Sequence, residues 1–312
     1  MGIREVPFPS HNGRDEIQAW VYEPVRPPRA VVQVVHGLGE HSRRYLHMIS
    51  TLLDAGFVVA ADDHAGHGRT AMVSGEWGDT GEDGAVTVVE DEASLHDRVR
   101  ELHPDLPYFL FGHSWGSMIG RGYASDHGDD LAGVALCGVA AQIHGIDAVV
   151  DRAGLAARIA AGEGTQRDDG YVDQMFDGFV SRYTHVNGPT DWIAVDPDVV
   201  RDHANDPFNN FTAPMTLRFV QDFIDLYDRV NSPGWYPQVR PDLPVLLLSG
   251  DMDPVANYGE GTYHVSNQLQ LSGHHDVRTR VWSGFRHEIH NDPETRALVE
   301  TEIVEFVEKH LG

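Results

Sequence analysis

Several features are scarce in this sequence of 312 residues, and each scarcity excludes a class of protein. Cys137 is the single cysteine, so no disulfide bond can form within the chain, and nothing in the composition calls for an oxidising compartment. No run approaches the roughly 18 apolar residues that a membrane-spanning helix needs. Residues 1–20 contain acidic side chains and lack the apolar stretch of a secretory signal. We therefore expect a cytoplasmic protein without a transmembrane segment.

Basic side chains are also scarce. Lysine and arginine together number 23, against 48 aspartate and glutamate residues, and the formal net charge at pH 7 is −25. Such an acidic surface repels phosphate backbones and anionic lipid headgroups, so we expect no nucleic acid partner. Hydrophobic residues make up 41% of the chain and charged residues 23%, which is typical of globular proteins that bury a large core.

Short apolar runs alternate with longer helical patterns along most of the chain. Several runs are apolar without alternation, which is typical of strands covered on both faces of a parallel sheet. The expected strands are 17–22, 30–35, 57–61, 108–111, 131–137, 245–249 and 277–282. The expected helices are 42–55, 86–102, 115–127, 259–271 and 295–310. This alternation predicts βαβ units, and therefore an α/β fold with a mostly parallel sheet flanked by helices.

One stretch interrupts the alternation. About a hundred residues before the expected strand 245–249 contain no convincing strand, and this length is too great for a simple crossover or a loop. We interpret the stretch as a helical insertion over the sheet. The expected organisation is a first core segment at residues 1–138, a helical cap or lid at 139–240, and a second core segment at 241–312.

The sharpest local signal is the run Gly-His-Ser-Trp-Gly at residues 112–116, which follows a strand pattern and precedes a helical one. This is the G-x-S-x-G nucleophile elbow in the strand, turn and helix context that it requires. The turn strains the serine and projects its hydroxyl, while the flanking glycines let neighbouring backbone pass without a Cβ clash. We predict that Ser114 is a catalytic nucleophile rather than a structural turn serine.

A serine hydroxyl needs a base to accept its proton, and the base needs a carboxylate to orient it. After an elbow of this type, the acid and then the histidine follow along the chain. His287 comes just after the expected strand 277–282, and we predict that it is the base, with His290 and His264 as weaker alternatives. Asp251 and Asp253 both follow the expected strand 245–249, at the end where open α/β sheets gather their sites. We favour Asp253, because two further residues carry it clear of the strand, and keep Asp251 as the alternative acid.

Acyl transfer also needs hydrogen-bond donors for the oxyanion that develops on the substrate. One expected donor is the backbone N–H of Trp115, the residue after the nucleophile. The other is the backbone N–H of Leu38, in the His-Gly-Leu-Gly loop that follows the expected strand 30–35. The alternative is that loop 36–39 is only a glycine turn between a strand and a helix.

Motifs spread along nearly the whole chain resemble those of one family, the α/β-hydrolases of the monoacylglycerol lipase, lysophospholipase and serine aminopeptidase group. The matching segments are HGLGEHSRRY at 36–45, DHAGHGRT at 63–70, GHSWGS at 112–117, GDMDPV at 250–255 and HEI at 287–289. The resemblance implies an α/β-hydrolase fold with a helical cap inserted after the sixth strand. It also implies a Ser-His-Asp triad, with the oxyanion donors beside it; the implied residues are Ser114, Asp253 and His287, then Leu38 and Trp115.

By this resemblance we expect a serine hydrolase of carboxylic esters that acts through an acyl-enzyme on monoacylglycerols or lysophospholipid-like single-chain lipids. We expect no cofactor and no metal, and a small-molecule ester or lipid as the partner. Apolar side chains of the expected cap would line a channel for an acyl chain, although aromatic residues at helical spacing also fill protein cores. The candidate substrate-binding residues are Phe179, Trp192, Phe211 and Met215.

Two other activities remain open. A serine aminopeptidase of the same fold would need carboxylates at the mouth of the cap to hold a free amino group, and a short-chain carboxylesterase would keep the mechanism without the lipid. A metal-dependent hydrolase is disfavoured, because residues 287–290 do not read H-E-x-x-H and the histidines His64 and His67 lie in a glycine turn without the tight H-x-H-x-D-H cluster. A non-catalytic binding module is disfavoured by the presence of every candidate triad residue in order. The sequence does not indicate the oligomeric state.

Overall fold

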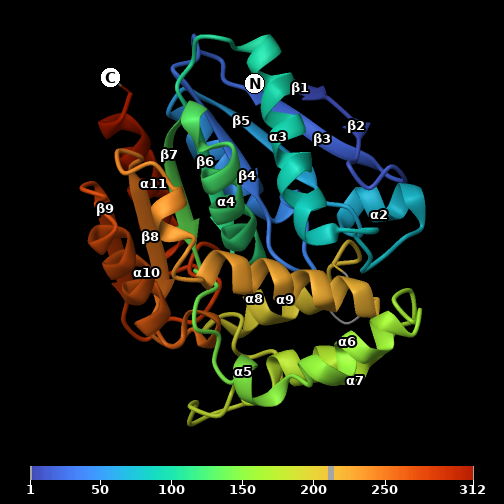
Figure 1. Cartoon of the computed structure of the whole chain (residues 1–312). Helices are drawn as coiled ribbons and strands as arrows, with labels where there is room; N and C mark the ends of the chain where they lie inside the picture. The colour runs from blue at the N-terminus through green and yellow to red at the C-terminus, as the bar shows by residue number, and fades with distance from the viewer. Residues whose placement is uncertain (1, 210–213, 312) are drawn as a thin grey trace.

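The computed structural model describes residues 2–209 and 214–311. Within those residues a nine-stranded sheet has the order β1-β3-β5-β4-β6-β7-β8-β9, with β2 paired to β3 (Figure 1). The strands are β1 (Gly2–Glu5), β2 (Phe8–Pro9), β3 (Glu16–Glu23), β4 (Ala30–Val35), β5 (Phe57–Asp63), β6 (Tyr108–His113), β7 (Leu131–Cys137), β8 (Val245–Gly250) and β9 (Val277–Trp282). The pairs formed by β3 are antiparallel, and the pairs that join β5, β4, β6, β7, β8 and β9 are parallel. The sheet is mostly parallel, as the sequence predicts.

The helices expected from the sequence are present within a few residues of their expected ends. In the core they are α1 (Leu46–Asp54), α3 (Gly84–Leu102), α4 (Trp115–Asp126), α10 (Glu260–Leu271) and α11 (Arg296–Lys309). The short elements β1, β2 and α2 (Gly68–Ser74) were not predicted. The insertion was expected after the sixth strand. Because the short strands β1 and β2 precede β3, it instead follows the seventh strand in chain order, β7.

Both faces of the sheet are covered by helices, which explains why its strands do not alternate between apolar and polar residues. Along β4, Val32 and Val34 pack in one hydrophobic cluster with side chains of α1 and α11. Val31 and Val35 pack in a second cluster with side chains of α3, α4 and α10. The carboxyl ends of the parallel strands are therefore held between two helical layers.

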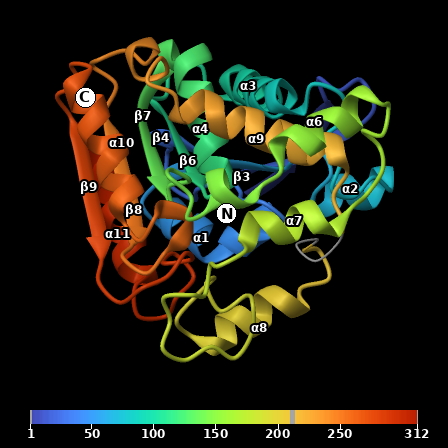
Figure 2. The same cartoon turned by 60° about the horizontal axis from the view of Figure 1, so that its bottom comes forward.

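The chain between β7 and β8 is helical, as expected for the insertion. Its helices are α5 (Ile146–Val149), α6 (Arg152–Ala160), α7 (Asp169–Phe176), α8 (Pro197–Asn205) and α9 (Leu217–Asn231). The long helix α9 packs against α3 and α4, while α5 to α8 lie beyond the end of the sheet to which the arrow of β7 points (Figures 1 and 2). The insertion therefore faces the carboxyl ends of the strands.

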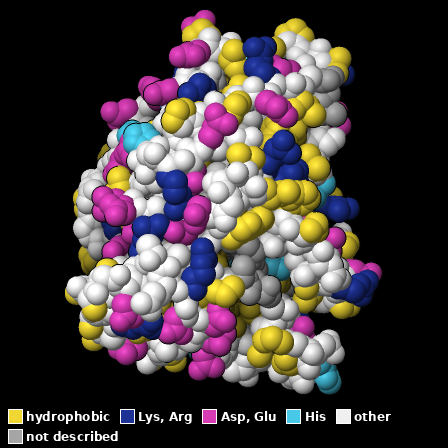
Figure 3. Space-filling view, turned by 90° about the vertical axis from the view of Figure 1, so that its right-hand side faces the viewer, with side chains coloured by type: hydrophobic (Ala, Val, Ile, Leu, Met, Phe, Trp, Pro, Cys, Tyr) yellow, Lys and Arg dark blue, Asp and Glu magenta, His cyan; other side chains and the backbone are white. Residues whose placement is uncertain are grey.

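The surface mixes side chains of every kind on the side that carries α2 (Figure 3). Acidic and basic groups lie among hydrophobic side chains there, and Met72 and Val73 of α2 are about half exposed, at 51% and 57%. The net charge of −25 therefore does not form a continuous acidic surface on this face. In the described ranges 2–209 and 214–311, no helix combines the length and apolar character needed to cross a membrane.

Candidate active site

Ser114 lies in a strained turn between β6 and α4. Its φ of 57° and ψ of −120° are rare for a residue with a side chain, and its N–H donates to the carbonyl of Cys137 at 3.0 Å. A Cβ added at Gly112 would lie 2.3 Å from the backbone oxygen of Gly116, and one added at Gly116 would lie 2.2 Å from the backbone oxygen of Val35. The glycines are therefore required by close backbone approach, as the sequence predicts for a nucleophile elbow.

His287 and Asp253 meet at the ends of two neighbouring strands. Nδ1 of His287, which follows β9, lies 2.9 Å from Oδ2 of Asp253, which follows β8. Both side chains are almost completely buried. Burial alone would lower the pKa of His287, but the charge of Asp253 and the hydrogen bond to it outweigh burial and raise that pKa.

Asp251, the alternative acid, lies elsewhere. Its carboxylate accepts hydrogen bonds from Oγ of Ser283 at 2.8 Å and from the N–H of Gly284 at 2.6 Å. It thereby holds the exposed turn after β9, which is the role of an aspartate in a tight turn. Of the two aspartates, Asp253 is the one in contact with His287.

The loop after β4 lies against the nucleophile. A Cβ added at Gly37 would come within 3.1 Å of Cβ of Ser114, and Leu38 lines the same cavity as Ser114. Trp115 is the first residue of α4, so its N–H has no acceptor within the helix. The two expected oxyanion donors therefore belong to backbone segments that flank Ser114.

Glu40 is a central residue of the site that the sequence analysis did not single out. Its carboxylate accepts hydrogen bonds from the N–H of Gly37 at 2.6 Å and from the hydroxyl of Tyr45 at 2.6 Å, and Nε of Arg44 lies 3.2 Å away. The ring nitrogen Nδ1 of His113 is 3.1 Å from the same carboxylate. Burial opposes ionisation, but the bond to His113 and the charges of His113 and Arg44 hold the pKa of Glu40 well below its usual value.

Arg44 extends this network to the histidine loop. Its NH2 group donates to Glu288 at 2.7 Å, and both side chains are buried. The spacing of four residues between Glu40 and Arg44, together with the position of Glu288 next to His287, is the sequence signal that could have identified these residues.

A cavity of about 570 Å³, including its opening to solvent, lies beside Ser114. The core lines the cavity with Gly37, Leu38, Glu40, His113, Ser114, Trp115, Val255, His287 and Glu288, and the first residues of the insertion add Ala140. The insertion lines it with Ile143, Ile146, Met175, Phe176, Phe179, Trp192, Ile193, His203 and Phe223. Apolar side chains thus come mainly from the insertion and polar ones mainly from the core.

The four expected substrate-binding residues have different outcomes. Phe179 and Trp192 line the cavity, and the ring of Trp192 lies 5.2 Å from that of His287. Met215 is placed elsewhere, because it is fully buried against Gly78, where an added Cβ would lie 3.3 Å from its Cγ. Phe211 lies outside the described residues.

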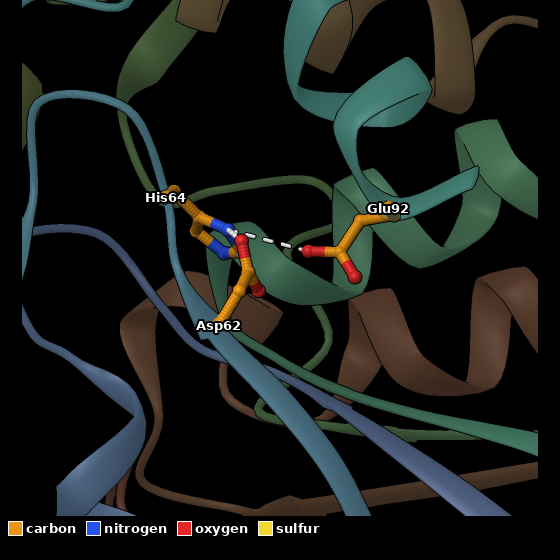
Figure 4. Close-up of side chains that lie close together, drawn as sticks. All are labelled: Asp62, His64 and Glu92. Carbon is orange, nitrogen blue, oxygen red and sulfur yellow. Dashed lines mark hydrogen bonds and ion pairs between the residues drawn. The ribbon is translucent and has the colours of Figure 1, made fainter. Parts of the chain in front are cut away.

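One group of side chains in the described ranges has the spacing of metal ligands. Asp62, His64 and Glu92 bring ligand atoms within 4.8 Å of one another (Figure 4). All three are fully buried, at the end of β5 and on α3. The ring of His64 lies 5.4 Å from the ring of Trp115, but none of the three residues lines the cavity beside Ser114.

Comparisons with known proteins give matches over nearly the whole chain. The family model described as serine aminopeptidase, S33, matches residues 26–294. A monoacylglycerol lipase of Mycolicibacterium smegmatis is 28% identical, and the alignment covers 93% of this chain and 92% of that protein.

Solved structures also match from end to end. One described as a lipase in an open form has a TM-score of 0.95 at 49% identity, and the alignment covers 100% of both chains. A thermostable carboxyl esterase from Bacillus coagulans, in complex with glycerol, has a TM-score of 0.96 at 48% identity, again over 100% of both chains. These matches include the helical insertion as well as the sheet.

Proposed function

Because the chain belongs to the serine aminopeptidase S33 family and has the α/β-hydrolase fold, we propose that it is a serine hydrolase that cleaves carboxylic esters. The observation that carries the proposal is one cavity lined by both Ser114, in a strained elbow, and His287, whose ring is held by Asp253. Strained nucleophiles with an oriented base beside them are the basis of covalent catalysis.

The proposed reaction starts with the proton of Ser114. Nδ1 of His287 donates to Asp253, which leaves Nε2 to accept the proton of the serine hydroxyl as Oγ attacks the acyl carbon. The N–H groups of Leu38 and Trp115 stabilise the oxyanion. His287 then returns the proton to the leaving alcohol. In the second half, His287 accepts a proton from water as the water attacks the acyl-enzyme, and then returns that proton to Oγ of Ser114 as the carboxylic acid leaves.

We propose that residues 139–240 act as a cap between core segments 1–138 and 241–312, and that the cap selects a single acyl chain. Support comes from the apolar side chains that the insertion contributes to the cavity, such as Met175 and Phe179. An apolar wall of this kind excludes water and favours a hydrocarbon chain over a polar one.

The proposed substrates are monoacylglycerols. The polar side of the cavity carries the carboxylates Glu40 and Glu288, and Arg44 is the guanidinium bound to both. The two carboxylates line the cavity and Arg44 does not, so a phosphate headgroup would meet acidic groups there, which favours an uncharged alcohol. The similarity to the mycobacterial monoacylglycerol lipase supports the same choice. We propose lysophospholipids as the second substrate class.

A serine aminopeptidase is the second candidate, because the same two carboxylates could attract a free amino group and because the matching family carries that description. Both carboxylates are already bound to Arg44, however, so they are less available to an incoming ammonium group than unpaired acids would be. A short-chain carboxylesterase would use the same catalytic residues without filling the apolar side of the cavity.

One substrate panel separates these candidates. It contains monoacylglycerols of graded chain length, lysophosphatidylcholine, short nitrophenyl esters and amino-acid amides. Each is assayed with wild type, with Ser114→Ala and with a control variant, Ser125→Ala, near the far end of helix α4. We expect monoacylglycerol turnover that disappears only in Ser114→Ala and that persists with a chelator present. Turnover confined to short esters would leave the carboxylesterase, amide cleavage would favour the aminopeptidase, and undiminished activity of Ser114→Ala would refute the nucleophile.

A further inference from the structure

His36, the residue after β4, is a completely buried histidine whose ring nitrogens both have a backbone partner. The backbone N–H of His64 donates to its Nε2 at 3.1 Å, and its Nδ1 lies 2.8 Å from the carbonyl oxygen of Gly37. A backbone N–H can only donate and a carbonyl can only accept. The proton of His36 must therefore be on Nδ1, and Nδ1–H donates to Gly37.

This bond orients the peptide that joins Gly37 to Leu38. A trans peptide is planar, so its C=O and its N–H point in opposite directions, and the described residues contain no cis peptide. When His36 holds the carbonyl of Gly37 on one side, the N–H of Leu38 must point to the other side. Leu38 lines the cavity beside Ser114, so this N–H is the one expected to bind the oxyanion.

The preceding peptide, between His36 and Gly37, is held at both ends as well. The N–H of Gly37 donates to Glu40 at 2.6 Å, and Nε2 of His64 lies 3.2 Å from the carbonyl of His36. Glycine has little intrinsic resistance to rotation of the peptides on either side of it. A larger residue cannot replace it, because a Cβ added at Gly37 would lie 2.6 Å from the carboxylate of Glu40. The orientation of the loop therefore depends on these hydrogen bonds.

His64 is held in turn by the buried carboxyl groups of Asp62 and Glu92 (Figure 4). Its Nδ1 is 3.3 Å from Oδ2 of Asp62 and 3.2 Å from Oε1 of Glu92. Nε2 faces the carbonyl of His36, which can only accept, so Nε2 must carry a proton. Nδ1 faces the two carboxyl groups, and a proton there would bridge it to Asp62. Gln33 anchors Glu92 through its side-chain amide.

The electrostatics of the two stacked rings agree with these protons. The ring centroids of His36 and His64 are 3.8 Å apart. Burial lowers the pKa of His64, but the charge of Asp62 and the bond to it outweigh burial and raise that pKa, which favours the charged form of the ring. Burial, and then the charge of His64, hold the pKa of His36 well below its usual value, so His36 stays neutral.

We propose that His36 is a positioning residue of the oxyanion hole, which aims the N–H of Leu38 through its Nδ1–H bond to Gly37. The backbone N–H of His64 keeps His36 in the required tautomer, and the carboxyl groups of Asp62 and Glu92 hold the ring of His64 beside it. The inference rests on the proposed serine hydrolase function. According to this proposal, the buried residues Asp62, His64 and Glu92 hold protons rather than bind a metal ion.

A pair of substitutions at His36 separates positioning from packing. The amide of asparagine reaches the place of Nδ1 and can still donate to Gly37, whereas the amide of glutamine reaches the place of Nε2 and cannot. We expect His36→Gln to lower kcat by about 10- to 100-fold with KM nearly unchanged, since a misplaced oxyanion donor costs transition-state binding only. We expect His36→Asn to keep kcat within about threefold of wild type, because it restores the donor. The exposed His185→Gln serves as the control.

Inhibitor binding gives a second readout of the same interaction. A boronic acid that forms a tetrahedral adduct with Ser114 should lose affinity in His36→Gln by the same factor as kcat/KM, because transition-state analogues report transition-state contacts. An unreactive substrate ether should bind wild type and both variants alike. Equal losses of kcat in His36→Gln and His36→Asn would overturn the proposal, because packing alone would then explain the effect.

Neutron diffraction of the wild-type protein tests the tautomers without any variant or activity. We expect a proton on Nδ1 but not on Nε2 of His36, and protons on both nitrogens of His64. A proton on Nε2 of His36, or a stoichiometric metal ion between Asp62, His64 and Glu92, would overturn the assignment. An inactive wild type with these protons in place would instead count against the proposed function, so the two failures can be told apart.

Discussion

Arg44 donates a 2.7 Å hydrogen bond to Glu288, although 244 positions separate the two residues in the chain. The guanidinium also lies 3.2 Å from Glu40, and all three side chains are at most 4% exposed. Glu40 binds the N–H of Gly37, and Glu288 follows His287. One buried cation therefore joins the loop of the expected oxyanion donor to the loop of the expected base.

Removing this cation should destabilise the protein strongly. We expect Arg44→Met to lower the free energy of unfolding by about 3–5 kcal/mol, because the buried carboxylates of Glu40 and Glu288 would lose the cation that joins them. The matched control is Arg201→Met, whose ion pair with Asp198 is exposed and should be worth less than about 1 kcal/mol. Denaturant titration of both variants measures the difference, and equal losses would show that the buried network does not support the fold.

The two aspartates after β8 should differ sharply in their effect on activity. We expect Asp253→Asn to lower kcat by about 10³- to 10⁴-fold, because an asparagine favours the wrong tautomer and orientation of His287. Asp251→Asn should leave kcat within a few-fold, since Asp251 holds only the turn at Ser283 and Gly284. Steady-state kinetics on a nitrophenyl ester measures both, and a larger loss in Asp251→Asn would reverse the assignment of the acid.

The pH dependence of kcat/KM should reflect the raised pKa of His287. The base accepts a proton only when it is neutral, so activity should increase with pH through a midpoint above the ordinary histidine value of about 6.5. In Asp253→Asn the midpoint should move to lower pH, because burial still disfavours the charged ring and the opposing carboxylate is gone. A wild-type profile that stays flat between about pH 5 and pH 9 would be inconsistent with His287 as the base.

The glycine after Trp115 should be indispensable for folding. A Cβ at Gly116 would lie 2.2 Å from the backbone oxygen of Val35, and backbone in the middle of the sheet cannot move aside. We expect Gly116→Ala to lower the free energy of unfolding by about 3 kcal/mol or more, as overpacking against a rigid neighbour does. Gly128→Ala is the control, since nothing lies within 4 Å of its added Cβ. Thermal unfolding of the two variants compares them, and similar melting temperatures would contradict the close approach.

Asp222 should make the stability of the protein depend on pH. This residue of α9 lies against the start of α3, where a Cβ added at Gly84 would be 2.6 Å from its Oδ2, and burial raises its pKa from 3.8 to about 7. A raised carboxyl pKa means that the folded state loses stability as the pH increases from about 4 to 7. Asp222→Asn removes the ionisation, so its stability relative to wild type should increase by about 2–4 kcal/mol over that range.

The control for Asp222 is Gln270→Ala, which replaces an exposed side chain that does not ionise. Its stability relative to wild type should stay nearly constant with pH. Denaturant titrations at about pH 4.5 and pH 8 measure both variants. A constant difference for Asp222→Asn would mean that its carboxyl group titrates normally in the folded protein.

Most of the fold was predictable, because the signals that define it are local. The continuous apolar runs at β4 and β8 reflect burial on both faces, and the expected helices end close to where α3, α4 and α10 end. The short strands β1 and β2 were missed because two to four residues carry too little periodicity to be recognised. Met215 was misplaced because an apolar residue looks the same in sequence whether it faces a cavity or fills a core.

The sequence by itself determined the elbow at Ser114 and the order in which an acid and a histidine follow it. Those features depend on local backbone strain, on glycines within two positions and on the ends of strands, all of which a short segment encodes. Only the tertiary structure decided that Asp253 rather than Asp251 contacts His287, and that Glu40, Arg44 and Glu288 form one network. The same holds for the tautomer of His36, which is set by the N–H of a residue 28 positions away. Hydrogen bonds between distant segments depend on distances of a few tenths of an ångström, and these exist only once the sheet has brought the loops together.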